Sequence, residues 1–530
     1  MSITKAIGNA MSGLRVNSRQ AEIASRNVSN ASVEGYTAKT LALSHEVHGG
    51  QPGGVRADGV RRAGDPFLVA ERRGESARSG ALSTEGEALR RIADAVMDPD
   101  GGDGLHDRMR KLEGALRSLA DTPESAALRR EAAEAAQGVA DKLNTLSTDA
   151  TRLRMDADRE IGRQVDTVNG ALSAIERLTR EIQTTAAAGR DVSALEDERE
   201  RQIEIVNAII PVKSATPVNG GLQLIAEGGG TLMAGSARPL SFEPSGDVAG
   251  FEGLAQGGKR VDDPATQAAT GGDTAREFRG IGLGGGSLEA LFRVRDEIGR
   301  DYAAQLDAVA RDLIERFQGD ASFVDGSTAM AGFAKDDGAA PPATPREYLG
   351  LFADYDAAGA AEIRFPADAA AADAAEAGLA RRIRVAAPIL STPALLADPS
   401  EDTQRLMARD PGATPAPDTF PSALYHAMRA QRAVASDAGP SAALGLDGAR
   451  TTLDMTTEWV ALRERAAGAA EREASFASGR VEALREEELA ASAVDTDEEM
   501  RRLLAIEKAY AANARVLQVA DQMLSAILEI

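Results

Sequence analysis

Two glycine-rich stretches contain the residue types of nucleotide-binding loops. Residues 253–259 read Gly-Leu-Ala-Gln-Gly-Gly-Lys, where glycine amides and a lysine could meet phosphate groups. The next residue is Arg260, whereas such loops place a Ser or Thr there to hold Mg²⁺. Gly280, Gly282 and Gly285 have the spacing of a dinucleotide fingerprint, but no hydrophobic strand precedes them. Both stretches are better explained as connections between structural elements, and no cofactor is predicted.

Side chains that hold metals or act as nucleophiles are sparse. The chain has 530 residues with four histidines and no cysteine, which excludes disulfides, thiol nucleophiles and thiolate metal sites. His45 and His48 lie close together without a third ligand, so surface positions are the better interpretation. Asp98, Asp100 and Asp103 fall in a glycine-rich turn that lacks further ligands, which favours a connection between helices. No metal site and no catalytic residue is predicted, although carboxylates that converge on folding stay an open alternative.

Composition restricts the partners of the chain. A formal net charge of −22 leaves no basic surface for nucleic acid, whose sequence-independent binding depends on Lys and Arg. No run approaches the roughly 20 apolar residues that span a bilayer, so membrane insertion is not predicted. The first thirty residues lack the basic start, apolar stretch and cleavage site of a secretory signal, and we expect no cleaved signal peptide. Aromatic residues make up only 4% of the chain, which favours closely packed, alanine-rich helices.

Both ends of the chain carry apolar and small side chains in alternating steps of three and four residues. This spacing is typical of a helix that packs lengthwise on another helix. The first seam comprises Ile3, Ile7, Ala10, Leu14, Asn17, Ala21, Ala24 and Val28, and the second comprises Ile506, Ala509, Asn513, Val516, Ala520, Met523, Ile527 and Ile530. The second seam is widened by Tyr510, Leu517 and Leu524. We expect both ends to be buried, in each other or in a neighbouring copy.

The residues expected to form the assembly interface are the larger side chains of these two seams. They are Ile3, Ile7, Leu14, Val28, Tyr510, Leu517, Met523, Leu524 and Ile527. Asn17 and Asn513 could fix the register of the two helices, as polar seam residues do in coiled coils, or could face solvent. Because the alanines of the first seam bury little area, the helices should be marginal alone. We therefore expect fast hydrogen exchange in residues 1–30 and 495–530 of the isolated protein.

The pattern between the ends predicts a mainly α fold with inserted β structure, in an elongated, multidomain chain. Long three-and-four spacing from Leu128 to Ile182 predicts a rod-shaped bundle, with Thr122-Pro123-Glu124 as its cap. Period two after Pro211 predicts an antiparallel meander. We expect an assembly helix over 1–34 that pairs with a second assembly helix over 491–530. Residues 35–210 should form an extended segment and a long-helix bundle, which is completed by residues 287–319 and 422–490. A β-rich domain over 211–286 and a variable insertion rich in Pro and Ala over 320–421 are the remaining parts. Thr496 and Glu499 have the spacing of a capping box at the start of the last helix.

Several segments resemble bacterial flagellar rod, hook and hook-associated proteins. Residues 27–37, Asn-Val-Ser-Asn-Ala-Ser-Val-Glu-Gly-Tyr-Thr, resemble the N-terminal signature of this family, and residues 494–500 and 508–517 resemble its C-terminal counterpart. Residues 195–200, Leu-Glu-Asp-Glu-Arg-Glu, and residues 286–291, Gly-Ser-Leu-Glu-Ala-Leu, are similar to the hook-associated members. Glu196 and Glu198 depart from the residues expected in the internal motif, and Ala38 stands where a basic residue is common.

The resemblance implies a structural protein of the flagellum that assembles with its own copies as a junction between hook and filament. It implies a location outside the cell, reached by unfolded export through the flagellar type III apparatus. The implied partners are the hook protein, a second junction protein and a dedicated export chaperone on the C-terminal helix. Alternatives are another flagellar axial protein, a cytoplasmic coiled-coil scaffold, or a wall hydrolase with a catalytic insertion in residues 320–420.

Overall fold

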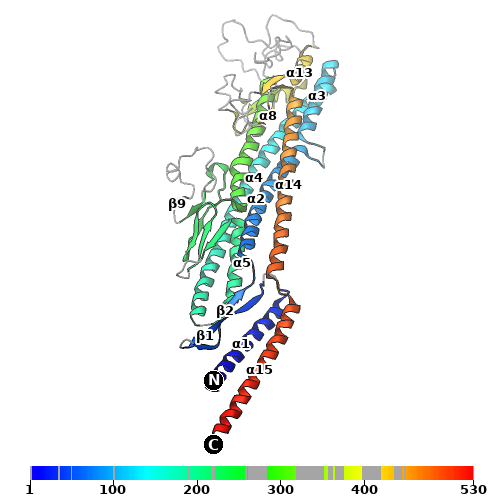
Figure 1. Ribbon diagram of the computed structural model, residues 1–530. Helices are drawn as coiled ribbons and strands as arrows, with labels where there is room; N and C mark the ends of the chain where they lie inside the picture. The colour runs from blue at the N-terminus through cyan, green and yellow to red at the C-terminus, as the bar shows by residue number, and fades with distance from the viewer. Residues whose placement is uncertain are drawn as a thin grey trace.

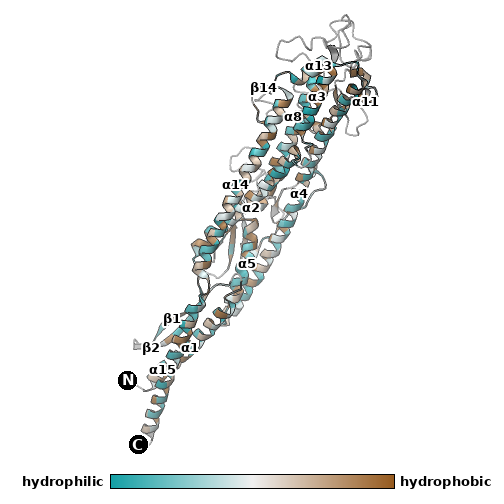
Figure 2. Cartoon of the chain, turned by 90° about the vertical axis from the view of Figure 1, so that its right-hand side faces the viewer, coloured by the Kyte–Doolittle hydropathy of each residue, from teal (hydrophilic) through white to brown (hydrophobic). Residues whose placement is uncertain are grey.

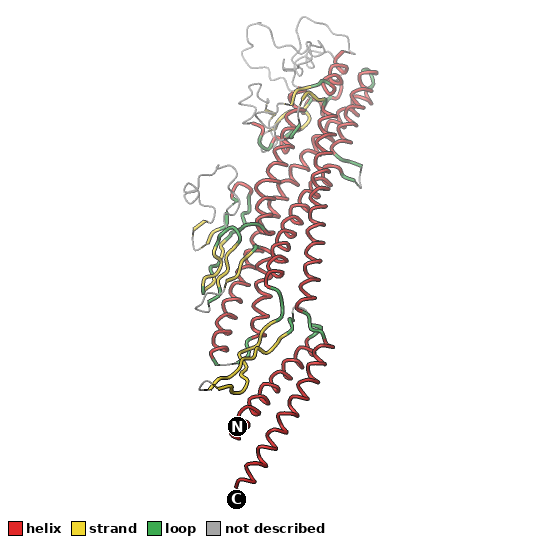
Figure 3. The backbone as a smooth tube through the Cα atoms, viewed as in Figure 1, coloured by secondary structure: helices red, strands yellow, loops and turns green. Residues whose placement is uncertain are grey.

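The computed structural model describes an elongated molecule with its two termini close together at one end (Figure 1). The described residues are 3–33, 36–48, 51–99, 102–188, 190–215, 221–251, 253–256, 259–260, 283–317, 351–355, 362–363, 375–396, 419–434, 444–446 and 448–528. Helices dominate and small antiparallel sheets lie beside them, which confirms the mainly α fold with inserted β structure (Figure 3). Most of the predicted insertion over 320–421 lies outside the described residues.

Long helices form the central bundle. They are α2 (Pro66–Met97), α3 (Leu105–Asp121), α4 (Ala126–Ala187), α5 (Ser193–Ile209), α7 (Gly286–Arg293), α8 (Gly299–Phe317) and α14 (Thr452–Ser492). The apolar stripe of α4 is buried along its length, as Leu143, Ile161 and Ile175 show with no exposed surface. Figure 2 shows the same helices with hydrophilic residues interspersed along their outer surface. The sequence spacing therefore identified the buried face of the longest helix correctly.

Local signals fix the starts of the bundle helices. The Asp65 carboxylate accepts a hydrogen bond from the Phe67 amide, and Pro66 takes the first helical position of α2. The N-cap of α4 is Ser125, three residues after the predicted cap at Thr122. The Ser125 side chain accepts a hydrogen bond from the Leu128 amide. Thr122 instead ends α3. The predicted cap at Thr122 is therefore wrong, since the chain needs residues 122–125 to turn between two helices.

The segment before α8 contains one turn of π-helix over Val294–Ile298, which joins α7 to α8. Gly299 follows this turn at a close approach, because a Cβ there would lie 2.5 Å from Arg154 Cγ. The Arg154 guanidinium donates to the Arg295 carbonyl at 2.8 Å. A wider turn at this point directs Arg295 into the bundle, where the side chain is almost fully buried.

The β-rich domain packs beside α4. Strands β3 (Val212–Ala215), β4 (Gln223–Ala226), β5 (Thr231–Ala234) and β6 (Ser236–Ala237) form one antiparallel sheet in sequence order, which confirms the predicted meander. Strand β7 (Leu240–Ser241) does not join this sheet. It pairs with β8 (Ala255–Gln256), which also pairs with β9 (Lys259–Arg260), and these three strands form a separate sheet. The antiparallel pairing of β8 and β9 is not the strand–loop–helix arrangement that a phosphate-binding loop requires.

A buried ion pair ties this domain to the bundle. Arg295 and Asp158 lie 2.7 Å apart, and both side chains are essentially without exposed surface. The other Asp158 oxygen accepts the Ser245 amide at 2.7 Å, and the Arg295 guanidinium lies 4.8 Å from the centre of the Phe251 ring. The hydrogen bonds and the ring satisfy charges that would otherwise be costly to bury.

The far end of the bundle carries small elements around α8. They are β10 (Phe352–Tyr355), β11 (Glu362–Ile363), α10 (Leu379–Arg382), β12 (Arg384–Val385), α11 (Ala387–Ser391), α13 (Thr419–Arg429), β13 (Arg432–Val434) and β14 (Gly448–Arg450). The Asp307 carboxylate accepts the amides of Gly378 and Ala380, and Glu376 bonds Arg311 at 2.8 Å. Within the described residues, no helix combines the length and apolar character needed to cross a bilayer.

Candidate assembly interface

The first and last helices pair as antiparallel neighbours at the end of the molecule. Helix α1 (Ile3–Asn30) and helix α15 (Thr496–Leu528) lie side by side below the bundle (Figure 1). Gly13 meets Asn513 near the middle of the pair, and Asn27 meets Glu499 near its upper end. Residue numbers therefore increase along one helix as they decrease along the other. Along the second seam, Ile506 and Ala520 are buried and Asn513 is half-buried, whereas Ala509, Val516 and Met523 are exposed, so only part of that seam faces α1.

The predicted interface residues divide into two groups. Ile7, Leu14, Val28 and Leu517 are partly buried, whereas Tyr510, Met523 and Leu524 are exposed. Ile3 and Ile527 lie in the two helices, but their side chains are outside the described part of the structure. The buried apolar positions of the pair are the small residues Ala10, Ala24 and Ala520 and the larger residues Val16, Ile23 and Ile506. Tyr510, Met523 and Leu524 of α15 remain available on the surface of the single chain.

The two seam asparagines take different positions. Asn513 packs against Gly13, where a Cβ would lie 2.7 Å from its Nδ2 and 3.1 Å from its Cγ. Asn17 is buried, and its Nδ2 has no hydrogen-bond partner among the described residues. The glycine therefore lets the Asn513 side chain lie directly on the backbone of α1. This contact couples the register of the helices through packing.

A long hairpin lies against α1. Strands β1 (Lys39–His48) and β2 (Gln51–Arg62) pair antiparallel with bulges, where the sequence led us to expect an irregular segment. The Ser12 hydroxyl accepts the Val55 amide at 3.2 Å, and Gly54 approaches Ser12 so closely that no side chain fits between them. Strand β2 is rich in glycine and arginine and shows weak alternation, so the sequence pattern gave little indication of the pairing.

Asn27 forms the centre of the joint between the helix pair and the rest of the molecule. Its Nδ2 donates to the Lys39 carbonyl at 2.9 Å and to Glu499 Oε1 at 3.1 Å. Its Oδ1 accepts from the Tyr36 hydroxyl at 2.9 Å and from the Lys39 amide at 3.1 Å. The Asn27 side chain has no exposed surface. One amide thus joins α1, the start of the hairpin and the first turn of α15.

Charged contacts extend the joint to helix α5. Lys39 Nζ lies 2.8 Å from Asp197, Arg62 lies 2.9 Å from the same carboxylate, and Lys39 also lies 4.8 Å from the centre of the Tyr36 ring. Burial, followed by the charge of Asp197, raises the pKa of the Tyr36 hydroxyl, which therefore stays protonated and donates to Asn27. The segments of the resemblance described above, residues 27–37 and 195–200, meet here.

A second ionic cluster supports the base of the bundle. Glu204 on α5 bonds Arg72 at 2.8 Å and Arg73 at 2.7 Å, both on α2. Burial opposes ionisation of Glu204, but the two guanidiniums outweigh it and hold the pKa of this carboxyl below its usual range. Arg72 also pairs with Glu488 near the end of α14. The three helices that meet the joint are therefore tied to one another.

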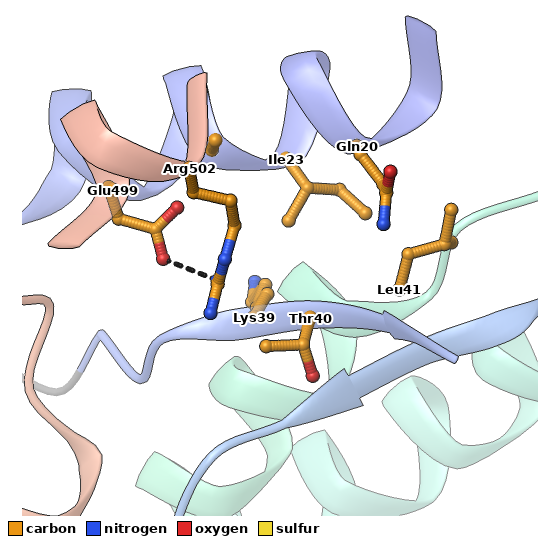
Figure 4. Close-up of a pocket in the computed structure, with 8 residues that line it drawn as sticks. Gln20, Ile23, Lys39, Thr40, Leu41, Glu499 and Arg502 are labelled. Carbon is orange, nitrogen blue, oxygen red and sulfur yellow. Dashed lines mark hydrogen bonds and ion pairs between the residues drawn. The ribbon is translucent and has the colours of Figure 1, made fainter. Parts of the chain in front are cut away.

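Beside the joint lies a small polar pocket of about 190 Å³ (Figure 4). It is lined by Gln20, Ile23, Ala24, Lys39, Thr40, Leu41, Glu499 and Arg502. Glu499 Oε1 accepts from Arg502 at 2.9 Å and from Asn27 at 3.1 Å, so the Glu499 side chain does not take the role of the predicted capping box. Asp495 caps α15 instead, because it accepts the amides of Asp497 and Glu498. Within the described residues, no cluster of three or more His, Asp or Glu side chains could hold a metal.

An apolar flank of α15 has no cover in the single chain. Val516, Val519 and Met523 are 45%, 47% and 52% exposed, at spacings that place them on one side of the helix. Together with Ala6 and Ala520 they line a groove of about 330 Å³. Exposed apolar surface of this kind is typical of an interaction site.

The sequence did not predict that Asn27 and its hydrogen-bond partners form a site. Asn27 and Tyr36 appeared only as parts of a family signature, Glu499 as a cap, and Asp197 as part of an internal motif. They come together from segments about 10 to 470 positions apart, and no spacing rule brings such positions together. The available signal was the signature itself, because its polar residues have no role in a helix seam.

Comparisons with known proteins agree with this architecture. Residues 90–319 match the family described as the flagellar hook-associated protein FlgK helical domain, and residues 486–530 match the flagellar basal body rod FlgEFG protein C-terminal family. Flagellar hook-associated protein 1 of Salmonella typhimurium is 30% identical over 251 residues, which cover 45% of this chain and 44% of the relative. The protein of the same name from Bacillus subtilis is 26% identical over 38% of this chain and 42% of the relative.

The solved structure of the flagellar hook junction protein FlgK from Burkholderia pseudomallei has a TM-score of 0.40 and 19% identity, over 54% of this chain and 46% of that chain. The C-terminal segment is thus similar to that of flagellar rod proteins, and residues 90–319 are similar to the helical domain of flagellar hook-associated proteins. The similarity to flagellar hook-associated protein 1 covers less than half of this chain. The chain spans less than half the length of the curated relatives it matches.

Proposed function

We propose that this chain is a structural component of the flagellum that self-assembles into the junction between hook and filament. The terminal helix pair forms the contact between copies, and the bundle with its β-rich domain projects from it. Similarity to flagellar hook-associated proteins supports a flagellar structural role over an enzymatic one. The predicted interface residues, including Tyr510, Met523 and Leu524, belong to this proposed contact.

The observation that carries the proposal is the uncovered apolar flank of α15. The buried face of the helix pair combines small residues such as Ala10 and Ala520 with larger ones such as Ile506, and a second side of α15 stays exposed. Val516, Val519 and Met523 are each about half exposed, so their burial between copies would contribute about 1 kcal/mol per side chain. Repeated at every contact in a ring or tube, such gains favour assembly.

The proposed partners are further copies of this chain, the hook protein and a second junction protein. The proposed location is outside the cell, in the flagellum. The apolar flank of α15 also suits a dedicated export chaperone, because an uncovered amphipathic helix requires a partner groove before assembly. Assembly and chaperone binding would then use the same face at different times.

The test places charge on the flank without disturbing the pair. Val519→Asp with Met523→Asp introduces two carboxylates at exposed positions, and Gln522→Asp is the matched control on the neighbouring exposed face of the same helix. In cells that lack the native protein, the double variant should yield hooks without filaments, while Gln522→Asp should restore filaments and swimming. Electron microscopy of labelled flagella should locate the wild-type chain between hook and filament. Normal filaments on the double variant, or label elsewhere, would contradict the proposal.

A further inference from the structure

We propose that Asn27 is a positioning residue that sets the direction in which the terminal helix pair leaves the bundle. The proposal goes beyond the junction function, because it concerns the internal geometry of one chain. It assigns a role to a buried polar side chain that contributes nothing to the apolar contact between the helices.

The Asn27 amide is fully used. A carboxamide offers two N–H donors and two acceptor sites on oxygen, and all four are engaged here. If the oxygen and nitrogen of the amide were exchanged, the NH₂ group would face the Lys39 N–H, and the oxygen would face the Lys39 carbonyl. Both hydrogen bonds to the Lys39 backbone would then be lost. The network therefore fixes the orientation of the side chain. Any other orientation of this buried side chain would leave polar atoms without hydrogen bonds, so the observed orientation is much more favourable than the alternatives.

The partners of Asn27 come from different parts of the chain. Glu499 lies in the first turn of α15, and Tyr36 and Lys39 lie where the chain enters the hairpin. Lys39 continues the connection to Asp197 on α5, which belongs to the bundle. A tilt of the helix pair against the bundle would break several of these bonds together. The joint should therefore behave as a fixed angle.

A local capping role would have a different geometry. Asn30, three residues later in α1, donates to the Arg26 carbonyl one turn back at 2.8 Å, as side chains near helix ends often do. The hydrogen bonds given above for Asn27 all leave α1. Asn30 is therefore a matched control for substitution by aspartate.

Two substitutions isolate the contact between Asn27 and Glu499. Asn27→Asp keeps the two accepted bonds but removes both donors and places a carboxylate beside Glu499, where the present separation is 3.1 Å. Glu499→Gln then supplies an amide that can donate to the new carboxylate and removes the repulsion. The double variant should recover the geometry that the first variant loses.

The chain contains no cysteine, so two introduced cysteines give unique labelling sites. Spin labels at Gln518→Cys on α15 and Ser173→Cys on α4, both exposed positions, report the angle by electron spin resonance distances in the purified chain. We expect a narrow distribution for the wild type and for Asn30→Asp, a shifted and broadened one for Asn27→Asp, and recovery on adding Glu499→Gln. Circular dichroism should show an intact bundle in each variant.

An unchanged distribution in Asn27→Asp would overturn the proposal, as would failure of Glu499→Gln to restore it. A broad distribution in the wild type would overturn it too, since the joint would then have no fixed angle. The measurement uses the purified chain, so its outcome is independent of whether the protein forms the hook–filament junction.

Discussion

Substitution of Gly13 by alanine tests the packing of the helix pair at its tightest point. In an exposed helix interior, Gly→Ala normally stabilises by about 1 kcal/mol. At Gly13 the added Cβ would lie 2.7 Å from Asn513 Nδ2 and 3.1 Å from Asn513 Cγ, closer than side chains tolerate. Overpacking of this kind typically costs about 1–3 kcal/mol. The two effects oppose each other, and we expect Gly13→Ala to weaken the pair by about 1 kcal/mol.

Two further variants test whether the contact between Gly13 and Asn513 causes this loss. Gly8 lies on the same helix, and a Cβ added there would have no atom within 4 Å, so Gly8→Ala should stabilise α1 by about 1 kcal/mol. Asn513→Ala removes the atoms that Gly13→Ala meets. The double variant should therefore be more stable than the sum of its single variants by about 1–3 kcal/mol.

Hydrogen exchange of the α1 amides is the suitable assay, because it reports local opening of the helix pair without unfolding the bundle. We expect faster exchange in Gly13→Ala, slower exchange in Gly8→Ala, and recovery when Asn513→Ala is added to Gly13→Ala. If Gly13→Ala slowed exchange as Gly8→Ala does, or if Asn513→Ala gave no recovery, the close contact between the helices would be refuted.

Three other predictions concern the bundle, its far end and the termini. Asp158→Ala removes the fully buried carboxylate that pairs with Arg295, which also pairs with Asp296, and should lower the stability of the β-rich domain by about 3 kcal/mol. Asp156→Ala breaks only exposed pairs and should cost less than about 1 kcal/mol. Thermal unfolding measures both losses, and equal losses would contradict the buried pair. Burial raises the pKa of Asp307 to about 6 and the pKa of Glu376 to about 7, so the folded state holds these protons more tightly than the unfolded state. Stability from these groups should therefore rise as pH falls from about 7 towards 4, and Glu376→Gln should flatten this dependence in melting curves; an unchanged pH dependence would oppose it. In the isolated protein the pair of α1 and α15 should open more easily than the bundle, so its amide hydrogens should exchange faster than those of α4, and equal protection would contradict this lower local stability.

The sequence predicted the long elements of the fold well, because helix periodicity and capping are local. The spacing from Leu128 to Ile182 located the buried face of α4. The predicted caps at Thr122 and Thr496 were wrong by a few residues, since several neighbouring polar side chains compete for the same amides. An extended segment was expected after residue 35, but its pairing as the hairpin of β1 and β2 was missed, because the glycines and arginines of β2 hide its alternation.

The candidate site was harder to predict. Seam spacing shows that a helix has an apolar face, but it does not show which part the partner helix covers. Ala520 is buried against α1 while Met523, one turn later, is exposed. Asn27, Lys39 and Asp197 meet only through the folding of distant segments. Each of these side chains is polar, so hydrophobic patterning gave no indication of their burial.

The central claim is that the exposed flank of α15 becomes buried between copies of the chain in the flagellum. A single cysteine at Met523 measures this directly, because the chain has no other thiol. A maleimide should label Met523→Cys rapidly in the purified chain, at least about tenfold more slowly in isolated intact flagella, and rapidly again after the flagella are dissociated. Equal labelling rates in the purified chain and in intact flagella would contradict the account.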